Sequence, residues 1–186
     1  RWLMVFLVVT AVLFSCQDQQ RDALVTGGVT WPDSVSWWKA NNLRVIQVNL
    51  PAYEGGLNTD SLVHDLKAVS ANTLIINAGG IMAFYPSEVE NHYINPNMKP
   101  DMVRDVVQKC HAAGIRVIVR FDFSRAHRSV FEKHPDWFYI SPDGERIIND
   151  DMYVVSINAP YEQDVLFRII DEVIRKYPID GIFINM

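Results

Sequence analysis

The sequence predicts an α/β fold built on a parallel β-sheet, because four short apolar segments alternate along the chain with three amphipathic ones. The clearest apolar segment spans residues 115–124 and is rich in β-branched and aromatic side chains, which is typical of a buried parallel strand. The expected loops are long after strands and short after helices. This asymmetry favours a TIM (β/α)8 barrel. The rival doubly wound sheet lacks support, since no strand leads into a phosphate-binding glycine pattern.

The expected elements follow one another in a regular order. Apolar runs predict four strands, at residues 43–50, 73–77, 115–124 and 182–185. Apolar stripes predict three helices, at residues 60–70, from about 100 to 113, and at residues 161–176. Thr59 is the candidate N-cap of the first helix, while Pro100 and Gly114 begin and end the second, on whose apolar face Cys110 should be buried. Residues 31–42 should form a short helix, and residues 125–160 a long loop with one helical turn at 129–133.

Four strand–helix units make half of an eight-stranded barrel, and the sequence ends at Met186, inside or just after its fourth strand. Such a half would leave two open sheet edges. We therefore expect residues 31–186 to be the N-terminal half of a TIM barrel, truncated after the fourth strand. We also expect the chain to be a fragment of a longer protein and to be inactive on its own.

The N-terminal residues predict export. Arg1 precedes an apolar run from Trp2 to Phe14, too short for a transmembrane helix but suited to a signal peptide. The run ends in Leu13-Phe14-Ser15-Cys16, which resembles the bacterial lipobox with Cys16 as the lipidated residue. We expect residues 1–16 to be a lipoprotein signal peptide, residues 17–30 a tether, and the protein to be lipid-anchored in the bacterial cell envelope. An ordinary secretory signal is the alternative.

The composition and the spacing of charged residues, cysteines and histidines indicate which classes of partner and cofactor to expect. The net charge is −5, and the lysines and arginines are scattered rather than clustered, so we expect no nucleic-acid partner. The two cysteines form no disulfide framework, and the histidines lack metal-ligand spacing, so we expect neither a metal site nor a cofactor. The membrane should be contacted through the lipid anchor only.

Polar side chains recur near the carboxyl ends of the four predicted strands: Asn49, Asn77, Arg120 with Asp122, and Asn185. Parallel α/β folds place their chemistry at these ends, and residues two apart in a strand point to the same side. We interpret this set as the rim of a site for a ligand with many hydroxyl groups. The alternative is a structural Arg120–Asp122 network beside asparagines that merely end strands.

Several motifs then occur in a characteristic order: Ala78-Gly79-Gly80-Ile81, Ala83-Phe84-Tyr85-Pro86, Arg120-Phe121-Asp122-Phe123-Ser124, His134-Pro135-Asp136-Trp137, Asn158-Ala159-Pro160-Tyr161 and Asp180-Gly181-Ile182-Phe183-Ile184-Asn185-Met186. Together they resemble the bacterial family called hypothetical glycosyl hydrolase 6. That TIM-barrel family is related to the α-L-fucosidase and β-galactosidase clans. The resemblance covers about residues 43–186.

The resemblance implies a glycan substrate and a glycoside hydrolase, which generally needs two carboxyl groups. In the related clans the nucleophile tends to end strand four, where this sequence has Asn185, so we expect the nucleophile beyond Met186. Asp122 is then a substrate-hydroxyl binder or catalytic auxiliary, and Tyr85 and Trp137 are candidate platforms on which sugar rings stack. A non-catalytic carbohydrate-binding barrel, with the polar mouth but without the acid/base pair, is the alternative function.

Overall fold

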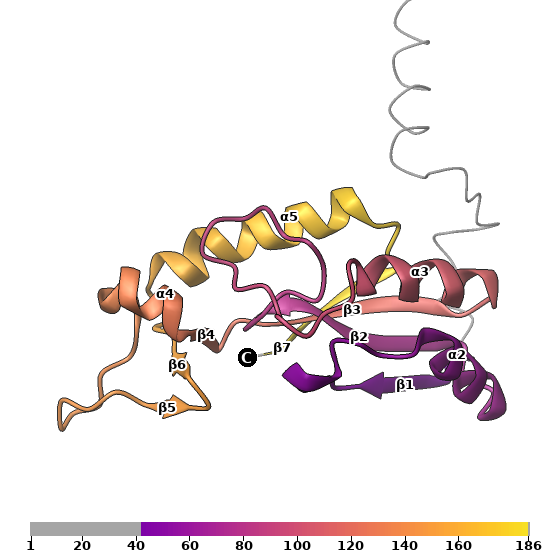
Figure 1. The fold of residues 1–186 in the computed structure, drawn as a ribbon, viewed down its shortest axis with the longest axis horizontal. Coiled ribbons are helices and arrows are strands. Elements are labelled where there is room, and N and C mark those ends of the chain that lie inside the picture. The colour runs from indigo at the N-terminus through magenta and orange to yellow at the C-terminus, as the bar shows by residue number, and fades with distance from the viewer. Residues whose placement is uncertain (1–41, 186) are drawn as a thin grey trace, which may run out of the picture. The chain divides into compact units, whose positions relative to one another are not determined.

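Four parallel strands form the main sheet in the order β1–β2–β3–β7 (Figure 1). Their bounds are β1 (Val45–Val48), β2 (Thr73–Gly80), β3 (Arg116–Asp122) and β7 (Gly181–Asn185). The computed structural model describes residues 42–185. The expected signal peptide and tether lie outside the described residues, as does the expected helix at 31–42 except for its last residue. The α/β class with a parallel sheet is thus confirmed.

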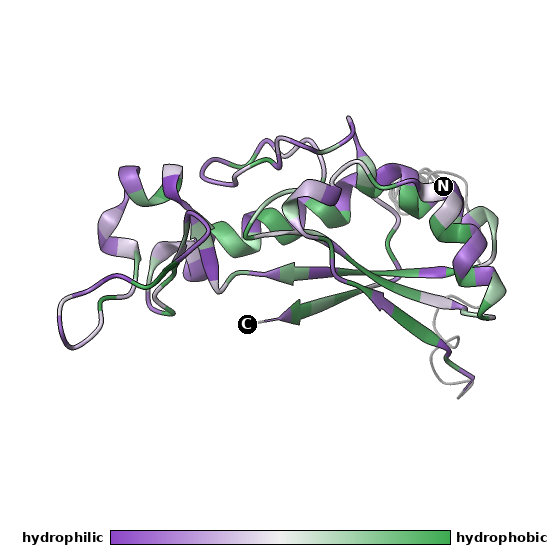
Figure 2. Cartoon of the chain, turned by 60° about the horizontal axis from the view of Figure 1, so that its bottom comes forward, coloured by the Kyte–Doolittle hydropathy of each residue, from purple (hydrophilic) through white to green (hydrophobic). Residues whose placement is uncertain are grey.

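Three helices lie against one face of this sheet, as Figures 1 and 2 both show. They are α2 (Thr59–Ala68), α3 (Met102–Ala112) and α5 (Leu166–Lys176). Side chains that alternate along β2 and β3 fill the space beneath them, with Leu74, Ile76, Val117 and Val119 at most 1% exposed. Ile118, on the opposite face of β3, is only half-buried. The main core therefore lies between the sheet and the helices.

The other face of the main sheet carries apolar side chains that no described helix covers. Phe183 of β7 and Val45 of β1 are 37% and 43% exposed. Figure 2 shows strands that are hydrophobic over most of their length, with hydrophilic segments near their ends. The strands at the two edges, β1 and β7, each pair with one neighbour within residues 42–185. This uncovered face carries the candidate site at its carboxyl end.

A second, smaller sheet lies beyond the carboxyl ends of the parallel strands (Figure 1). Its antiparallel strands are β4 (Arg125–His127), β6 (Met152–Val154) and β5 (Ile148–Asn149), in that order. The helix α4 (Arg128–Lys133) confirms the expected helical turn, but the prediction of a loop over the rest of residues 125–160 is wrong. Strands of two or three residues are too short to produce an alternating pattern, so the sequence gives no sign of them.

Several element ends differ from the expectations. The side chain of Asn58, rather than Thr59, caps α2 by accepting a hydrogen bond from Ser61 N. α3 begins after the cap Asp101, whose side chain accepts from Arg104 N. Strand β2 continues to Gly80 because pairing with β3 resumes beyond a bulge, although glycines have little tendency to form strands.

Short helical segments complete the fold. They are η2 (Ala52–Glu54), η3 (Pro135–Trp137) and the π-helical turn η4 (Tyr161–Val165), which forms the first part of the helix expected at 161–176. Cys110 is fully buried as expected, and burial raises the pKa of its thiol to about 12. No helix within residues 42–185 is long and apolar enough to cross a membrane.

Candidate functional site

The register of the parallel strands brings the predicted polar residues to one edge of the sheet. Asn77 on β2 lies opposite Arg120 on β3, and Asp122 on β3 lies opposite Asn185 on β7. A bulge between Asn77 and Gly79 offsets the last part of β2, so that Gly80 becomes the partner of Asp122. The period-two argument therefore places these side chains correctly, and their role in binding stays a prediction.

The carboxylate of Asp122 accepts four hydrogen bonds. Its Oδ1 accepts hydrogen bonds from Ser124 N at 3.2 Å and from Ser124 Oγ at 2.6 Å. Its Oδ2 accepts from Arg120 Nη2 at 3.0 Å and from Asn185 Nδ2 at 2.9 Å. Asp122 is 8% exposed, and a carboxylate so placed needs such donors to offset its lost hydration. The Arg120–Asp122 network, which was the alternative to a binding rim, thus exists and extends to β7, and the two interpretations share the same residues.

The same residues border a cavity of about 490 Å³ at the carboxyl edge of the sheet. Its polar lining is Asn49, Asn77, Arg120, Asp122, Arg125, Asn149 and Asp150. Its apolar lining includes Leu50, Ile81, Met82, Phe84 and Met152. The volume suits a ligand of a few sugar rings at most, and apolar walls with a few convergent polar groups are typical of small-molecule sites.

The asparagines of this cavity are fixed by local hydrogen bonds. Asn77 Oδ1 accepts from Leu50 N at 2.9 Å, which ties the end of β2 to the segment after β1. Asn49 Oδ1 accepts from Gln47 Nε2 at 2.8 Å. Each amide thereby keeps its NH2 group without a partner among residues 42–185. Such groups can donate to the hydroxyl oxygens of a ligand.

The small sheet supplies two cavity residues, Arg125 and Asn149, that the sequence pattern does not single out. Arg125 begins β4, and Asn149 ends β5. Asp150 follows in the turn between β5 and β6, where it is exposed and has a φ of 49°. Within the described residues Arg125 forms no ion pair, and the buried Arg120 Nε has no hydrogen-bond partner. No local signal identifies Arg125 or Asn149, because both depend on strands that leave no pattern in the sequence.

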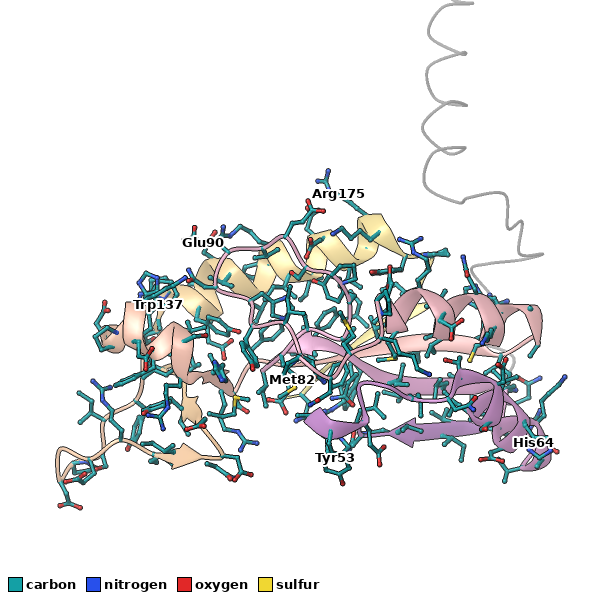
Figure 3. The ribbon with its side chains drawn as sticks, in the orientation of Figure 1. Tyr53, His64, Met82, Glu90, Trp137 and Arg175 are labelled. Carbon is teal, nitrogen blue, oxygen red and sulfur yellow. The ribbon has the colours of Figure 1, made fainter. Side chains whose placement is uncertain are left out.

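Two predicted stacking platforms do not face the cavity. Tyr85 is fully buried: its hydroxyl donates to Glu172 Oε2 at 2.7 Å and its ring packs edge-on against Tyr177. The Trp137 ring stacks on His134, with 3.8 Å between centroids, and Figure 3 shows it far from the cavity residue Met82. The expected stacking roles are therefore corrected: Tyr85 anchors the loop after β2 to α5, and Trp137 packs within the α4 region.

One further carboxyl group lies close to the site. Glu162, on the π-helical turn before α5, is 7% exposed. Burial raises its pKa, and the charge of Asp122 raises it further. Glu162 could not be predicted from the sequence, because nothing in a helical first turn distinguishes a buried glutamate from a solvated one.

The arrangement is suited to binding hydroxyl groups. Asp122 and Asp150 are acceptors, while the asparagine amides and the arginines are donors. No cluster of three His, Cys, Asp or Glu side chains within residues 42–185 is placed to hold a metal ion. The donors and acceptors that line the cavity make it a polar pocket that suits a polyhydroxylated ligand.

The fold is similar to that of several solved structures. For the α-L-fucosidase isoenzyme 2 from Paenibacillus thiaminolyticus the TM-score is 0.64 at 18% identity, over 77% of this chain and 23% of that one. A hypothetical protein from Ruminiclostridium thermocellum ATCC 27405 gives 0.59 at 15% identity, over 75% of each chain. The GH36 α-galactosidase AgaB from Geobacillus stearothermophilus gives 0.52 at 16% identity, over 75% of this chain and 20% of that one.

These likenesses concern the fold, a parallel sheet like that of glycoside hydrolase barrel domains. The chain spans only about a quarter of the fucosidase and a fifth of the galactosidase. No curated protein matches the sequence. A family model, however, matches residues 58–186. Because that match runs from the N-cap of α2 to the end of the chain, this protein belongs to the family described as hypothetical glycosyl hydrolase 6.

Proposed function

We propose that the chain contributes the first four parallel strands of a glycoside hydrolase barrel, and that its cavity binds a glycan. The observation that carries this proposal is the Asp122 carboxylate, fixed by Arg120, Ser124 and Asn185 at the wall of a polar cavity. Such a group is preorganised, because its hydrogen bonds hold it at the cavity wall in the position that it keeps when the ligand arrives. The family membership supports the choice of a glycan over other polyhydroxylated ligands.

Asp122 serves as a binding or auxiliary group in this proposal. Its two oxygens already accept four hydrogen bonds, which leaves little free electron density for nucleophilic attack. Hydrolysis needs an acid and a base or nucleophile. The resemblance places the nucleophile at the end of strand four, where this chain has Asn185, so we propose that the nucleophile lies outside residues 42–185.

A non-catalytic carbohydrate-binding barrel is the second candidate. It is favoured by Asn185, an amide at the end of β7 that donates to Asp122 instead of presenting a carboxylate to the ligand. Both candidates predict binding of a glycan. They differ only in whether the bound glycan is cleaved.

The barrel and export proposals rest on separate observations. The exposed Phe183 and Val45 on the uncovered sheet face are explained if further strands cover them. Export and lipid anchoring rest on the apolar run Trp2–Phe14 and on Cys16, which lie outside the described residues.

A glycan screen with the protein that contains this chain tests the function. Wild-type protein, Asp122→Asn and Asp105→Asn are compared for hydrolysis of an oligosaccharide panel and for binding to it by calorimetry. Asp105 is the control, because it lies on α3 and pairs with Lys109 at the solvent surface. A buried hydrogen-bonding group left unmatched costs about 1–3 kcal/mol, so Asp122→Asn should weaken binding or kcat/KM by about 5- to 150-fold.

Three results are distinguished. Cleavage that Asp122→Asn impairs and Asp105→Asn spares supports the hydrolase. Binding without cleavage, again impaired only by Asp122→Asn, supports the carbohydrate-binding barrel. Absence of any glycan binding by the wild-type protein, or equal behaviour of the two variants, contradicts the proposal.

A further inference from the structure

The last residue of β2 lies directly against the backbone of Asp122. Gly80 has a φ of 102°, and a Cβ on it would meet Asp122 O at 2.1 Å and Asp122 N at 2.6 Å. Only glycine fits at such a distance and in such a conformation. The peptide of Gly80 and the backbone of Asp122 therefore have to move together.

Two buried side chains form hydrogen bonds with the backbone of Gly80, one with its N–H group and one with its carbonyl oxygen. Its N–H donates to His92 Nε2 at 3.2 Å, and its carbonyl oxygen accepts from the Tyr161 hydroxyl at 2.9 Å. His92 is 6% exposed and Tyr161 is fully buried. Water therefore cannot replace either partner if it is removed.

The orientation of the His92 ring is fixed in turn. Burial lowers the pKa of His92 to about 3, so the ring is neutral at physiological pH. Because Nε2 accepts from Gly80, the proton must reside on Nδ1, which lies 2.9 Å from Ser87 Oγ. Ser87 then donates its own proton to Glu172 Oε2 at 2.7 Å. A directed chain of hydrogen bonds thus runs from α5 to the peptide beside Asp122.

We propose that His92 and Tyr161 are positioning residues for the Asp122 carboxylate, acting through the Gly80 peptide that both of them hold. Ser87 and Glu172 set the tautomer that His92 needs for this task. The inference deepens the proposed function, on which it rests, since it assumes that Asp122 acts at the glycan site.

The geometry explains why the position of the Asp122 carboxylate depends on the two hydrogen bonds to Gly80. Its carboxylate meets donors from Arg120 on its own strand and from Asn185 on the next. Both bonds have a narrow range of favourable distance and angle. If one partner of Gly80 is lost, the bulged end of β2 relaxes, the backbone of Asp122 follows, and the bond to Asn185 lengthens.

Tyr161→Phe tests the inference against Tyr177→Phe as its matched control. Both tyrosines are buried, and each hydroxyl donates one hydrogen bond, Tyr177 to Asp101 Oδ1 at 2.9 Å at the far end of α5. Both variants should lose thermal stability to a similar degree. Only Tyr161→Phe should weaken glycan binding, by about three- to tenfold, the usual net value of one hydrogen bond.

A second readout does not require a ligand. The side-chain amide of Asn185 is observed by NMR in asparagine-labelled protein and is assigned with Asn185→Asp. Its signal reports the bond to Asp122 Oδ2. It should shift in Tyr161→Phe and stay unchanged in Tyr177→Phe.

His92 is tested by a graded pair of substitutions. His92→Leu removes the acceptor for Gly80 N–H, whereas the side-chain carbonyl oxygen of His92→Gln can accept that bond and its NH2 can donate to Ser87. Binding and the Asn185 signal should change in His92→Leu and recover largely in His92→Gln. A purely structural role would lower the melting temperature without this recovery of binding.

The outcomes separate the two proposals. If Asp122→Asn leaves glycan binding intact, the proposed function fails, and the Asn185 signal still decides whether Asp122 is positioned through Gly80. If Asp122→Asn impairs binding but Tyr161→Phe matches Tyr177→Phe in affinity and in the Asn185 signal, the positioning role is overturned. A shifted signal with weakened binding in Tyr161→Phe alone supports it.

Discussion

Replacing Glu172 with glutamine should weaken the attachment of the loop after β2 to α5. The Glu172 carboxylate accepts from Lys176 Nζ at 2.8 Å and, each at 2.7 Å, from Glu88 N, Ser87 Oγ and the Tyr85 hydroxyl. Burial alone would raise the pKa of Glu172, but these four donors outweigh it and lower the pKa to about 2. A carboxylate that binds its proton less readily when folded stabilises the folded state.

The structure sets the size and sign of the effect. The interval between the ordinary pKa of 4.5 and the folded value of about 2, at about 1.4 kcal/mol per pH unit, gives at most about 3.5 kcal/mol. The side chain is 11% exposed, and we expect about 2–3 kcal/mol after solvent screening. Because the folded pKa is the lower one, this stability is present above pH 4.5. It is lost as the pH falls from 4.5 towards 2.

Thermal unfolding of the protein that contains this chain, followed between pH 7 and pH 3, measures the effect. Glu172→Gln should lower the melting temperature by about 5–10 °C at pH 7, and the difference from wild type should shrink below pH 4.5. Glu88→Gln is the control, since its 86% exposed side chain pairs with the same Lys176 and should contribute under about 1 kcal/mol. A Glu172→Gln difference that is absent at pH 7, or unchanged at pH 3, would refute this account.

Three further predictions concern Gly80, the N-terminal Cys16 motif of the sequence, and the uncovered sheet face. Gly80→Ala should lower the free energy of unfolding by more than about 4 kcal/mol, because the added Cβ would clash with the Asp122 backbone. Gly144→Ala should lower it by about 1–2 kcal/mol, because Gly144 has a φ of 84° but open space around it. Chemical denaturation of both variants measures the difference. Mass spectrometry should find a mature chain that begins at a lipidated Cys16, and an unlipidated chain with another start ends that claim. The isolated 186-residue chain should dimerise or aggregate through its uncovered sheet face, so a stable monomer in sedimentation would show that this face needs no partner.

The strand and helix patterns were sufficient to predict the main sheet and one edge of the site. Alternation along residues 116–122 puts Arg120 and Asp122 on one side, and the side-chain direction within a strand depends only on the local backbone. Parallel pairing then aligns Asp122 with Asn185 and Arg120 with Asn77, since all four strands run in one direction. These positions could be predicted because each depends on a local period and a single topological rule.

Other features were decided by contacts between residues far apart in the sequence. The sequence suggests that Tyr85 is an exposed loop aromatic, yet its hydroxyl donates to the carboxylate of Glu172, 87 residues away, and its ring is fully buried. Arg125 and Asn149 reach the cavity through strands of three and two residues, which tertiary pairing stabilises and local propensity does not.

The sequence by itself therefore determined the α/β class, the parallel direction of the strands and the edge at which polar groups gather. Only the tertiary structure decided which aromatic rings are buried, which loop residues complete the cavity, and how His92 and Tyr161 hold the Gly80 peptide beside Asp122. The physical reason is the range of the interactions. Backbone geometry and hydrophobic periodicity act over a few residues, whereas the hydrogen bonds that shape this region join residues up to 87 positions apart.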